Sequence, residues 1–233
     1  MQKPGSGSLK KALQVSNNFF HHCRYISLFL FITCFSFIPG NSIAQTHKSL
    51  DLRTEIELSE DRKEGPTEFF QFISNSTNYV SLGIPTTFLV KGILSHDKIA
   101  RKKSLYMFES LGISSAITFA VKYTFKRKRP FDASPLVIKA SGGGGPSFPS
   151  GHTSEAFSAA TSLSIAYPKW YVIAPAFVWA STVGYSRMYL GVHYPSDVLA
   201  GAIVGAGSAF LSYKINKWMQ SDRKKKRIIA NPY

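Results

Sequence analysis

The 233-residue sequence predicts an all-α fold: a bundle of six transmembrane helices with a polar extracytoplasmic segment after the first span. Three observations support this fold. Long apolar stretches recur along the chain, none of them alternates apolar and polar residues as strands do, and basic residues gather on alternate connections. We therefore expect helices that cross a membrane, with every second loop on the same side.

The first 44 residues are expected to form a targeting segment. A polar, basic stretch (1–24) precedes the apolar run 25–43, and the small residues Ser42 and Ala44 precede Gln45. This order is typical of a secretory signal with cleavage after Ala44, and an uncleaved signal anchor fits it about as well. Either alternative exports the chain that follows or inserts it into the membrane.

A polar segment, residues 45–76, comes next. It holds seven acidic residues against four basic ones, which is typical of a helix whose side chains face solvent. It ends in EFFQFISNSTNY, an amphipathic approach to an apolar stretch. We expect residues 45–76 to form a solvated, helical extracytoplasmic segment.

Five further apolar stretches are expected to form the rest of the bundle, over residues 77–214, with a basic cytoplasmic tail over 215–233. They hold 16 to 19 residues, slightly fewer than the roughly 20 of a typical span, so buried helices of a soluble protein are the alternative. Their small residues, including the G-x-x-x-G of Gly201 and Gly205, favour close helix contacts in lipid. The stretches are 77–95, 105–121, 153–168, 171–187 and 197–214.

The formal net charge of +15 fits nucleic acid, anionic lipid, a phosphorylated substrate or the orientation signal of a membrane protein. One set of alternate loops carries sixteen basic residues against two acidic ones and is therefore expected in the cytoplasm. The opposite loops carry eleven basic residues, five of them in KYTFKRKRP (122–130). An exported, apolar context argues against a nucleic-acid partner, so this cluster indicates an anionic ligand at the outer face.

Three polar clusters fall on that outer face: 122–130, FPSGH at 148–152 and SRMYLGVHYPSD at 186–197. Because their loops lie on one side of the expected bundle, the clusters can converge on one site. Such a site suits phosphate, since arginine donates in a planar fork that matches phosphate oxygens and lysine adds a point charge. The candidate phosphate-binding groups are Arg187, the basic residues of 122–130, and Ser150 and Gly151.

Ser150 and Gly151 are expected to open a helix, so that its N–H groups face the anion. An ordinary helix N-cap is the alternative for Ser150. The preceding SGGGGP is treated as a flexible loop without a chemical role.

The two histidines are the expected reactive groups. Pro195 makes one helix through His193 and Asp197 unfavourable, and a turn followed by a helix from near Asp197 brings the carboxylate to one imidazole nitrogen. The other nitrogen is then free to attack phosphorus. His152 is the expected general acid, because an imidazole can supply a proton near neutral pH. A purely structural His–Asp contact is the alternative.

No metal or other cofactor is expected. Only Cys23 and Cys34 occur, both near the start, so the bundle has no cysteine-rich metal site. Two histidines and an aspartate can bind Zn²⁺, but the adjacent arginines disfavour a cation. The basic side chains also neutralise the phosphate oxygens that would otherwise call for Mg²⁺.

These residues resemble the signature of the type 2 phosphatidic acid phosphatase (PAP2) family, K-x6-R-P, P-S-G-H and S-R-x5-H-x3-D. The first part matches Lys122, Arg129 and Pro130, and the second matches residues 149–152. The third part matches Ser186, Arg187, His193 and Asp197. All three parts are present, in the order of the family.

The resemblance implies a PAP2/haloperoxidase-like helical bundle and a membrane phosphatase of a lipid phosphomonoester or diphosphate. His193 would be the nucleophile that forms a phosphohistidine, with Asp197 as its partner and His152 as the acid. The residues that would bind phosphate are Lys122, Arg129, Ser150, Gly151 and Arg187. Family members act on lipid A phosphates, undecaprenyl diphosphate, phosphatidylglycerophosphate or phosphatidic acid. The expected place is the bacterial inner membrane, with the site facing the periplasm. The alternatives are a soluble exported acid phosphatase, a vanadate-dependent haloperoxidase and a non-enzymatic protein that binds anionic lipid.

Overall fold

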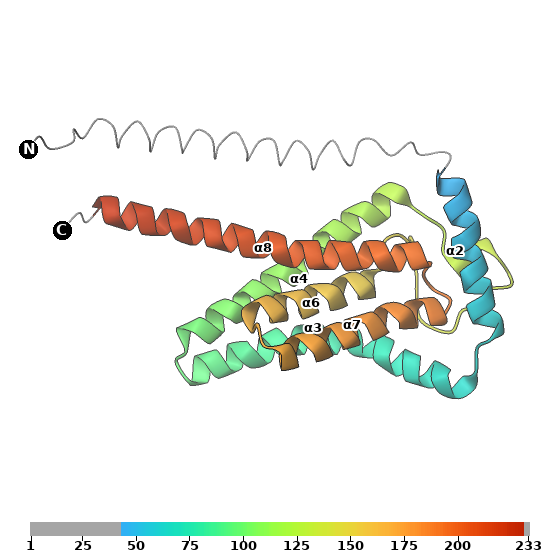
Figure 1. Ribbon diagram of the computed structural model, residues 1–233, viewed down its shortest axis with the longest axis horizontal. Helices are drawn as coiled ribbons and strands as arrows, with labels where there is room; N and C mark the ends of the chain where they lie inside the picture. The colour runs from blue at the N-terminus through green and yellow to red at the C-terminus, as the bar shows by residue number, and fades with distance from the viewer. Residues whose placement is uncertain (1–42, 231–233) are drawn as a thin grey trace, which may run out of the picture. The chain divides into compact units, whose positions relative to one another are not determined.

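The structure, a computed structural model, describes residues 43–230, and all but the last two residues of the expected 1–44 targeting segment lie outside this range. From Ser49 onward, the described residues form one compact unit. The described residues are helical and contain no strand, so the all-α prediction is confirmed (Figure 1). The helices are α2 (Ile43–Glu60), α3 (Glu64–Leu94), α4 (Lys98–Phe125), α5 (Pro130–Ala133), α6 (Gly151–Ala166), α7 (Trp170–Tyr189) and α8 (Pro195–Ala230).

Local chemistry explains where several helices begin. The Asp97 carboxylate accepts hydrogen bonds from the N–H groups of Ile99 (2.8 Å) and Ala100 (3.1 Å) and so caps α4. Proline is the first residue of α5 and of α8, where its missing N–H costs no helical hydrogen bond. The expected turn before Asp197 is therefore present, and α8 starts at Pro195.

Small side chains fill the interior of the bundle, while large apolar side chains lie outside. Serine, threonine and alanine line the buried faces of α4 and α6. On the outside, Phe119 is 63% exposed and Val178 66% exposed. Many large apolar side chains exposed on helices suggest contact with an apolar phase, and small residues at helix contacts are typical of proteins in lipid. The distribution supports a membrane protein.

The contact between α6 and α8 depends on glycine. A Cβ atom on Gly205 would lie 2.1 Å from the Ser154 carbonyl oxygen, and one on Gly201 would lie 2.7 Å from that of Ser150. Only glycine permits this approach of two backbones. The close contact predicted from G-x-x-x-G is confirmed.

Two segments are long and apolar enough to cross a membrane: Lys98–Ala133, which holds α4 and α5, and Pro195–Asp222 of α8. With 16 residues, α6 is about 24 Å long, shorter than the roughly 30 Å hydrocarbon core. The six-span arrangement stays a prediction. Two boundaries also differ from expectation, because α3 starts at Glu64, before the apolar stretch at 77–95, and α8 continues to Ala230.

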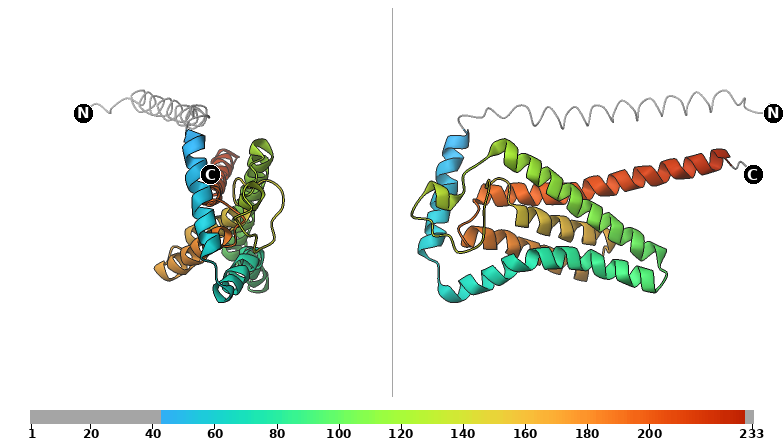
Figure 2. Two further views of the ribbon diagram at one scale, coloured as in Figure 1. Left: turned by 90° about the vertical axis from the view of Figure 1, so that its right-hand side faces the viewer. Right: turned by 180° about the vertical axis from the view of Figure 1, so that it is seen from behind.

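The 45–76 segment is helical as predicted, but it is only partly solvated. From Ser49 onward, α2 lies across the end of the bundle at which α8 begins (Figures 1 and 2). Asp51, Glu55 and Ser59 are buried, whereas Arg53 and Glu57 are exposed. The prediction of a solvated segment is therefore wrong for one face of α2, because that face packs against the loops described next.

Candidate active site

The structure brings the three predicted clusters together at the end of the bundle covered by α2. The Ser150 N–H donates to the Asp197 carbonyl (3.0 Å), which joins the second cluster to the third. The Arg129 guanidinium contacts His193, with 3.3 Å from Nη1 to Nε2, which joins the first to the third. Every predicted site residue lies in a helix end or in a loop at this face: Lys122, Arg129, Ser150, Gly151, His152, Arg187, His193 and Asp197.

His193 and Asp197 form the expected pair. The imidazole Nδ1 lies 3.4 Å from Asp197 Oδ2, and the Tyr194 N–H also donates to this oxygen (3.0 Å). An Nδ1–H that donates to the carboxylate leaves the lone pair on Nε2. Burial lowers the pKa of His193 to about 3, so the ring is neutral and Nε2 is nucleophilic at neutral pH.

The glycine-rich loop 141–145 encloses the two site arginines. Arg129 donates to the carbonyl groups of Gly144 (3.0 Å) and Gly145 (3.1 Å), and Arg187 donates to that of Gly142 (3.1 Å). A Cβ atom on Gly143 would lie 2.8 Å from Arg129 Nη1. The loop, which sequence analysis left without a role, thus fixes the direction of both guanidinium groups.

Arg187 is 2% exposed, and its Nη1 also donates to the Ser74 and Ser141 hydroxyl groups, the latter at 3.4 Å. Lys122 Nζ donates to the Pro146 carbonyl (2.7 Å). The cations of the site are therefore held in place by backbone and hydroxyl groups. Such fixed donors suit an anion because little reorganisation is needed when it binds.

Ser150 is the N-cap of α6, with its side-chain oxygen accepting from the N–H of Thr153 (3.5 Å) and from its hydroxyl (2.8 Å). The capping alternative is confirmed, and a role in phosphate binding stays a prediction. His152 follows in the first turn, before the expected span 153–168. Burial, and then the charges of Arg187 and other basic neighbours, lower the pKa of His152 to about 3.

Two functional contacts escaped sequence analysis. The Ser147 hydroxyl donates to Asp197 Oδ2 (2.5 Å), and Arg127 Nη1 donates to Asp197 Oδ1 (2.7 Å). Both residues lie beside the signature, Ser147 two positions before PSGH and Arg127 inside the basic run. The break in the charge rule at 122–130 was the available signal for Arg127, but it did not separate this residue from its neighbours.

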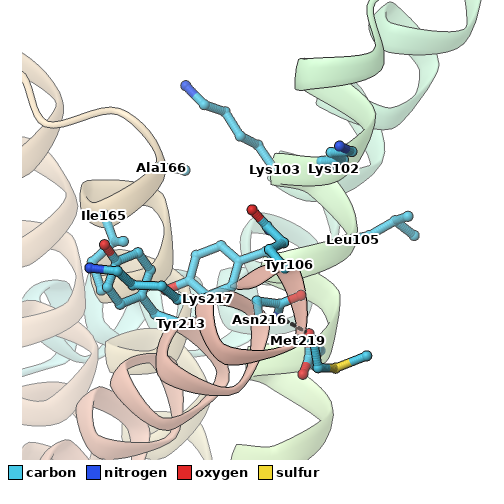
Figure 3. A pocket seen from close by; sticks show the side chains of 12 residues that line it. Lys102, Lys103, Leu105, Tyr106, Ile165, Ala166, Tyr213, Asn216, Lys217 and Met219 are labelled. Atoms are coloured by element: carbon cyan, nitrogen blue, oxygen red, sulfur yellow. Dashed lines mark hydrogen bonds between the residues drawn. The ribbon is translucent and has the colours of Figure 1, made fainter. Parts of the chain in front are cut away.

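Two cavities of the bundle differ in their relation to the site. One, of about 280 Å³, lies between α3, α4 and α6 and is lined by Lys122, His152 and Phe119. The other, of about 550 Å³, is lined by α4, α8 and the end of α6 (Figure 3). Its walls include Lys102, Lys217 and no signature residue. The first cavity is therefore the one next to the predicted chemistry.

Within residues 43–230, no group of three or more His, Cys, Asp and Glu side chains is arranged to hold a metal ion. The prediction of a metal-independent site stays a prediction.

Comparison with known families agrees with this geometry. A family model described as the PAP2 superfamily matches residues 103–220. The chain belongs to the PAP2 superfamily. The matched range includes all eight predicted site residues of this PAP2 protein.

Two curated relatives and one solved structure show the range of PAP2 proteins that the chain resembles. It is 37% identical over 90 residues to a lipid A 4′-phosphatase of Bacteroides thetaiotaomicron, covering 37% of this chain and 40% of that protein. It is 34% identical over 127 residues to an undecaprenyl-diphosphatase of Sulfolobus acidocaldarius, covering 54% of this chain and 61% of that protein. The chain thus spans about half the length of these relatives.

The solved structure is a transmembrane PAP2-type phosphatidylglycerolphosphate phosphatase of Bacillus subtilis. It has a TM-score of 0.63 and 28% identity, over 82% of this chain and 95% of that one. The helical bundle is therefore of the PAP2 type.

Proposed function

We propose that this PAP2 protein is a membrane phosphatase that hydrolyses a lipid phosphomonoester or diphosphate through a phosphohistidine. The observation that carries the proposal is the setting of His193. Its Nδ1 is directed at Asp197, and its Nε2 lies 3.3 Å from a buried guanidinium group. A nucleophile oriented by a carboxylate, beside fixed cationic donors, is suited to attack on phosphorus.

The first chemical step is displacement at phosphorus. The His193 Nε2 lone pair forms the N–P bond, and the bond from phosphorus to the leaving oxygen breaks. His152 gives its proton to that oxygen. Arg129, Arg187 and Lys122 neutralise the phosphate oxygens, and the N–H groups at Gly151 and His152 add donors from the start of α6.

The second step regenerates the enzyme. His152, now neutral, takes a proton from a water molecule whose oxygen attacks phosphorus. The N–P bond breaks, its electron pair returns to Nε2, and inorganic phosphate leaves. Asp197 stays ionised and stabilises the imidazolium character of His193 in both steps.

The substrate is a phosphorylated lipid. Lipid A phosphate, undecaprenyl diphosphate and phosphatidylglycerophosphate follow from the names of the relatives, and phosphatidic acid belongs to the same chemical class. The cavity beside His152 supports the proposal of a lipid substrate. Phe119 lines this cavity, and it and the other exposed apolar side chains of the bundle can contact acyl or prenyl chains. No metal, other cofactor or nucleic acid takes part.

The site faces the outer side of the bacterial inner membrane in this proposal, within a bundle of six spans over 25–43 and 77–214. The polar 45–76 segment lies outside the membrane and the 215–233 tail lies in the cytoplasm. The high basic content of 215–233 and of the loop at 96–104 supports this orientation.

One assay tests the activity. Detergent-purified protein is incubated with each of the four lipid classes, and released phosphate is measured for the native chain and for His193→Ala. We expect turnover of at least one lipid by the native chain, an acid-labile and base-stable phosphoenzyme, and a loss of about 10³-fold or more in His193→Ala. Full activity in His193→Ala would refute the mechanism, and native protein that releases phosphate from none of the lipids would refute the function.

A further inference from the structure

Helix α2 buries its polar face. Asp51, Glu55 and Ser59 recur every four residues and are buried, whereas Leu50 is 58% exposed. Residues four apart lie on one face of a helix. Helices usually bury their apolar face and expose their polar one, and α2 does the reverse. A buried carboxylate is costly unless it is paired, so we expect the buried face of α2 to contact a cation or hydrogen-bond donors.

The contact is Arg127, in the loop after α4. Its guanidinium forms an ion pair with Asp51 Oδ2 (2.8 Å) through Nη2 and with Asp197 Oδ1 (2.7 Å) through Nη1. The same group lies over the Tyr194 ring, 3.9 Å from its centroid. One planar fork thus joins α2 to the carboxylate that orients the nucleophile.

A second link runs from Asp51 to the start of α8. The Ser196 N–H donates to Asp51 Oδ1 (3.2 Å), and the Ser196 hydroxyl donates to Oδ2. Asp51 therefore caps the N-terminus of the helix that carries Asp197, although it comes from a helix 145 residues earlier.

The two oxygens of Asp197 have different neighbours. Oδ2 contacts His193 Nδ1 and accepts hydrogen bonds from the Ser147 hydroxyl and the Tyr194 N–H, whereas Oδ1 accepts a hydrogen bond from Arg127 Nη1. The rotation of the carboxylate, and with it the direction in which Oδ2 meets the imidazole, is therefore limited by Arg127.

We propose that Asp51 and Arg127 are positioning residues for the catalytic Asp197, so that docking of α2 on the bundle completes the active site. The proposal rests on the phosphatase activity proposed above. Neither residue contacts the phosphate: Asp51 holds Arg127, and Arg127 holds the carboxylate.

The test compares Asp51→Asn, Arg127→Gln and the double variant with two controls, Asp61→Asn just after α2 and Lys128→Gln beside Arg127 in the loop after α4. Both control residues are exposed. Steady-state kinetics in detergent give kcat and KM, and amide hydrogen exchange reports the docking of residues 49–60. Asp51→Glu keeps the carboxylate and serves as the rescue variant.

We expect kcat to fall roughly 10- to 100-fold in Asp51→Asn and in Arg127→Gln, with KM changed less than about twofold, because misplacement affects the chemical step rather than phosphate binding. The double variant is expected to lose less kcat than the product of the two single losses, since both residues act in part through one contact, whereas Asp51→Asn also removes the link to Ser196. Exchange in α2 rises in the same variants, Asp51→Glu recovers part of kcat, and the controls behave as the native chain.

The proposal is wrong if the native chain turns over lipid and Asp51→Asn and Arg127→Gln keep its kcat. It is also wrong if KM rises in parallel with the loss of kcat, since this would indicate general disruption of the pocket. Native protein without turnover refutes the proposed function instead. Should Arg127→Gln fail to fold, the pair Asp51→Asn and Asp51→Glu decides alone.

Discussion

Both ends of the bundle are basic, but they hold their charges differently. At the α2 end, Arg129 is 5% and Arg187 2% exposed, and backbone carbonyl groups fix their N–H directions. At the other end, Lys102 and Lys217 border an open cavity of about 550 Å³ and are exposed (Figure 3). The difference teaches that a local excess of charge does not by itself make a catalytic site. Burial and fixed donors distinguish the end that is suited to chemistry.

The largest effect at the α2 end is expected for His152→Asn. The pKa of His152 lies near 3 without a bound anion, so the ring is neutral at pH 6, although the proposed mechanism needs it protonated. A bound phosphate raises that pKa, and binding at pH 6 therefore takes up a proton. We expect kcat to fall about 10²- to 10⁴-fold in His152→Asn.

Calorimetry of phosphate binding at pH 6, in two buffers of different ionisation enthalpy, measures the proton uptake directly. The native protein is expected to take up more protons than His152→Asn by up to one. Equal uptake in the two proteins would remove His152 from the role of general acid.

A smaller effect is expected from Gly143→Ala. The added methyl group meets Arg129 Nη1 at 2.8 Å and displaces a donor that points toward His193. We expect kcat/KM to fall roughly 10-fold or more, because the guanidinium no longer meets the phosphate in its fixed direction. In the control Gly112→Ala, a Cβ meets no atom within 4 Å. Equal kinetics in the two variants would show that the glycine-rich loop does not hold Arg129.

Glu55→Gln is expected to change stability rather than activity. Both carboxylate oxygens of Glu55 are buried without a hydrogen-bond partner. Burial, and then the negative charge of Asp197, raise the pKa of Glu55 to about 9. The positive charge of Arg62 lowers this pKa, and the charge of Asp51 raises it further. The folded chain therefore keeps a proton that the unfolded chain releases near pH 4.5, so this stabilisation is complete below pH 4.5 and is lost as pH rises toward 9.

Thermal unfolding in detergent measures this effect. The stability of the native protein is expected to fall relative to Glu55→Gln by up to about 1.4 kcal/mol per pH unit between pH 5 and 9. Glu57→Gln, on the exposed face of the same helix, is the control and should follow the native chain. A constant difference across this range would mean that Glu55 does not titrate there.

The smallest effect is expected at the other end. Lys217→Gln removes a cation from the cavity shown in Figure 3, far along α8 from Asp197. Turnover of the best lipid substrate should change less than about twofold, because an exposed lysine contributes little fixed field to a distant site. A larger loss of kcat would show that the two ends of the bundle act together, and the contrast drawn between them would be wrong.

The sequence predicted the residues of the candidate site better than the residues that hold them in place. His193, Asp197 and His152 were predicted from residue types and spacings that suit a phosphate site, and the resemblance to the family signature selected Lys122 and Arg129 within the basic run. The burial of Asp51 and Glu55 could not be predicted, because acidic residues four apart occur both on solvated helices and on helices that bury one polar face. The partner of Asp51 is 76 residues away, and only the folded bundle brings it near.

Glycine explains two further differences. The composition of 141–145 is the same in a free linker and in a loop pressed against arginine, so sequence alone did not distinguish them. The G-x-x-x-G of α8 was recognisable because its spacing has a direct geometric meaning. The apolar stretch 77–95 is only the later part of α3, which begins at Glu64 within the segment predicted to be helical, because apolar content does not mark a helix start.

The glycines of α8 set the spacing of the two helices that carry part of the candidate site. His152 is carried by α6 and Asp197 by α8, and the separation of the two axes is set where Gly205 meets the Ser154 carbonyl. A methyl group there, two turns along α8 from Asp197, would move apart His152, the expected acid, and Asp197, the expected partner of the nucleophile. The spacing between the expected acid and the carboxylate expected to orient the nucleophile is therefore set by a contact between two helix backbones that lies outside the site itself.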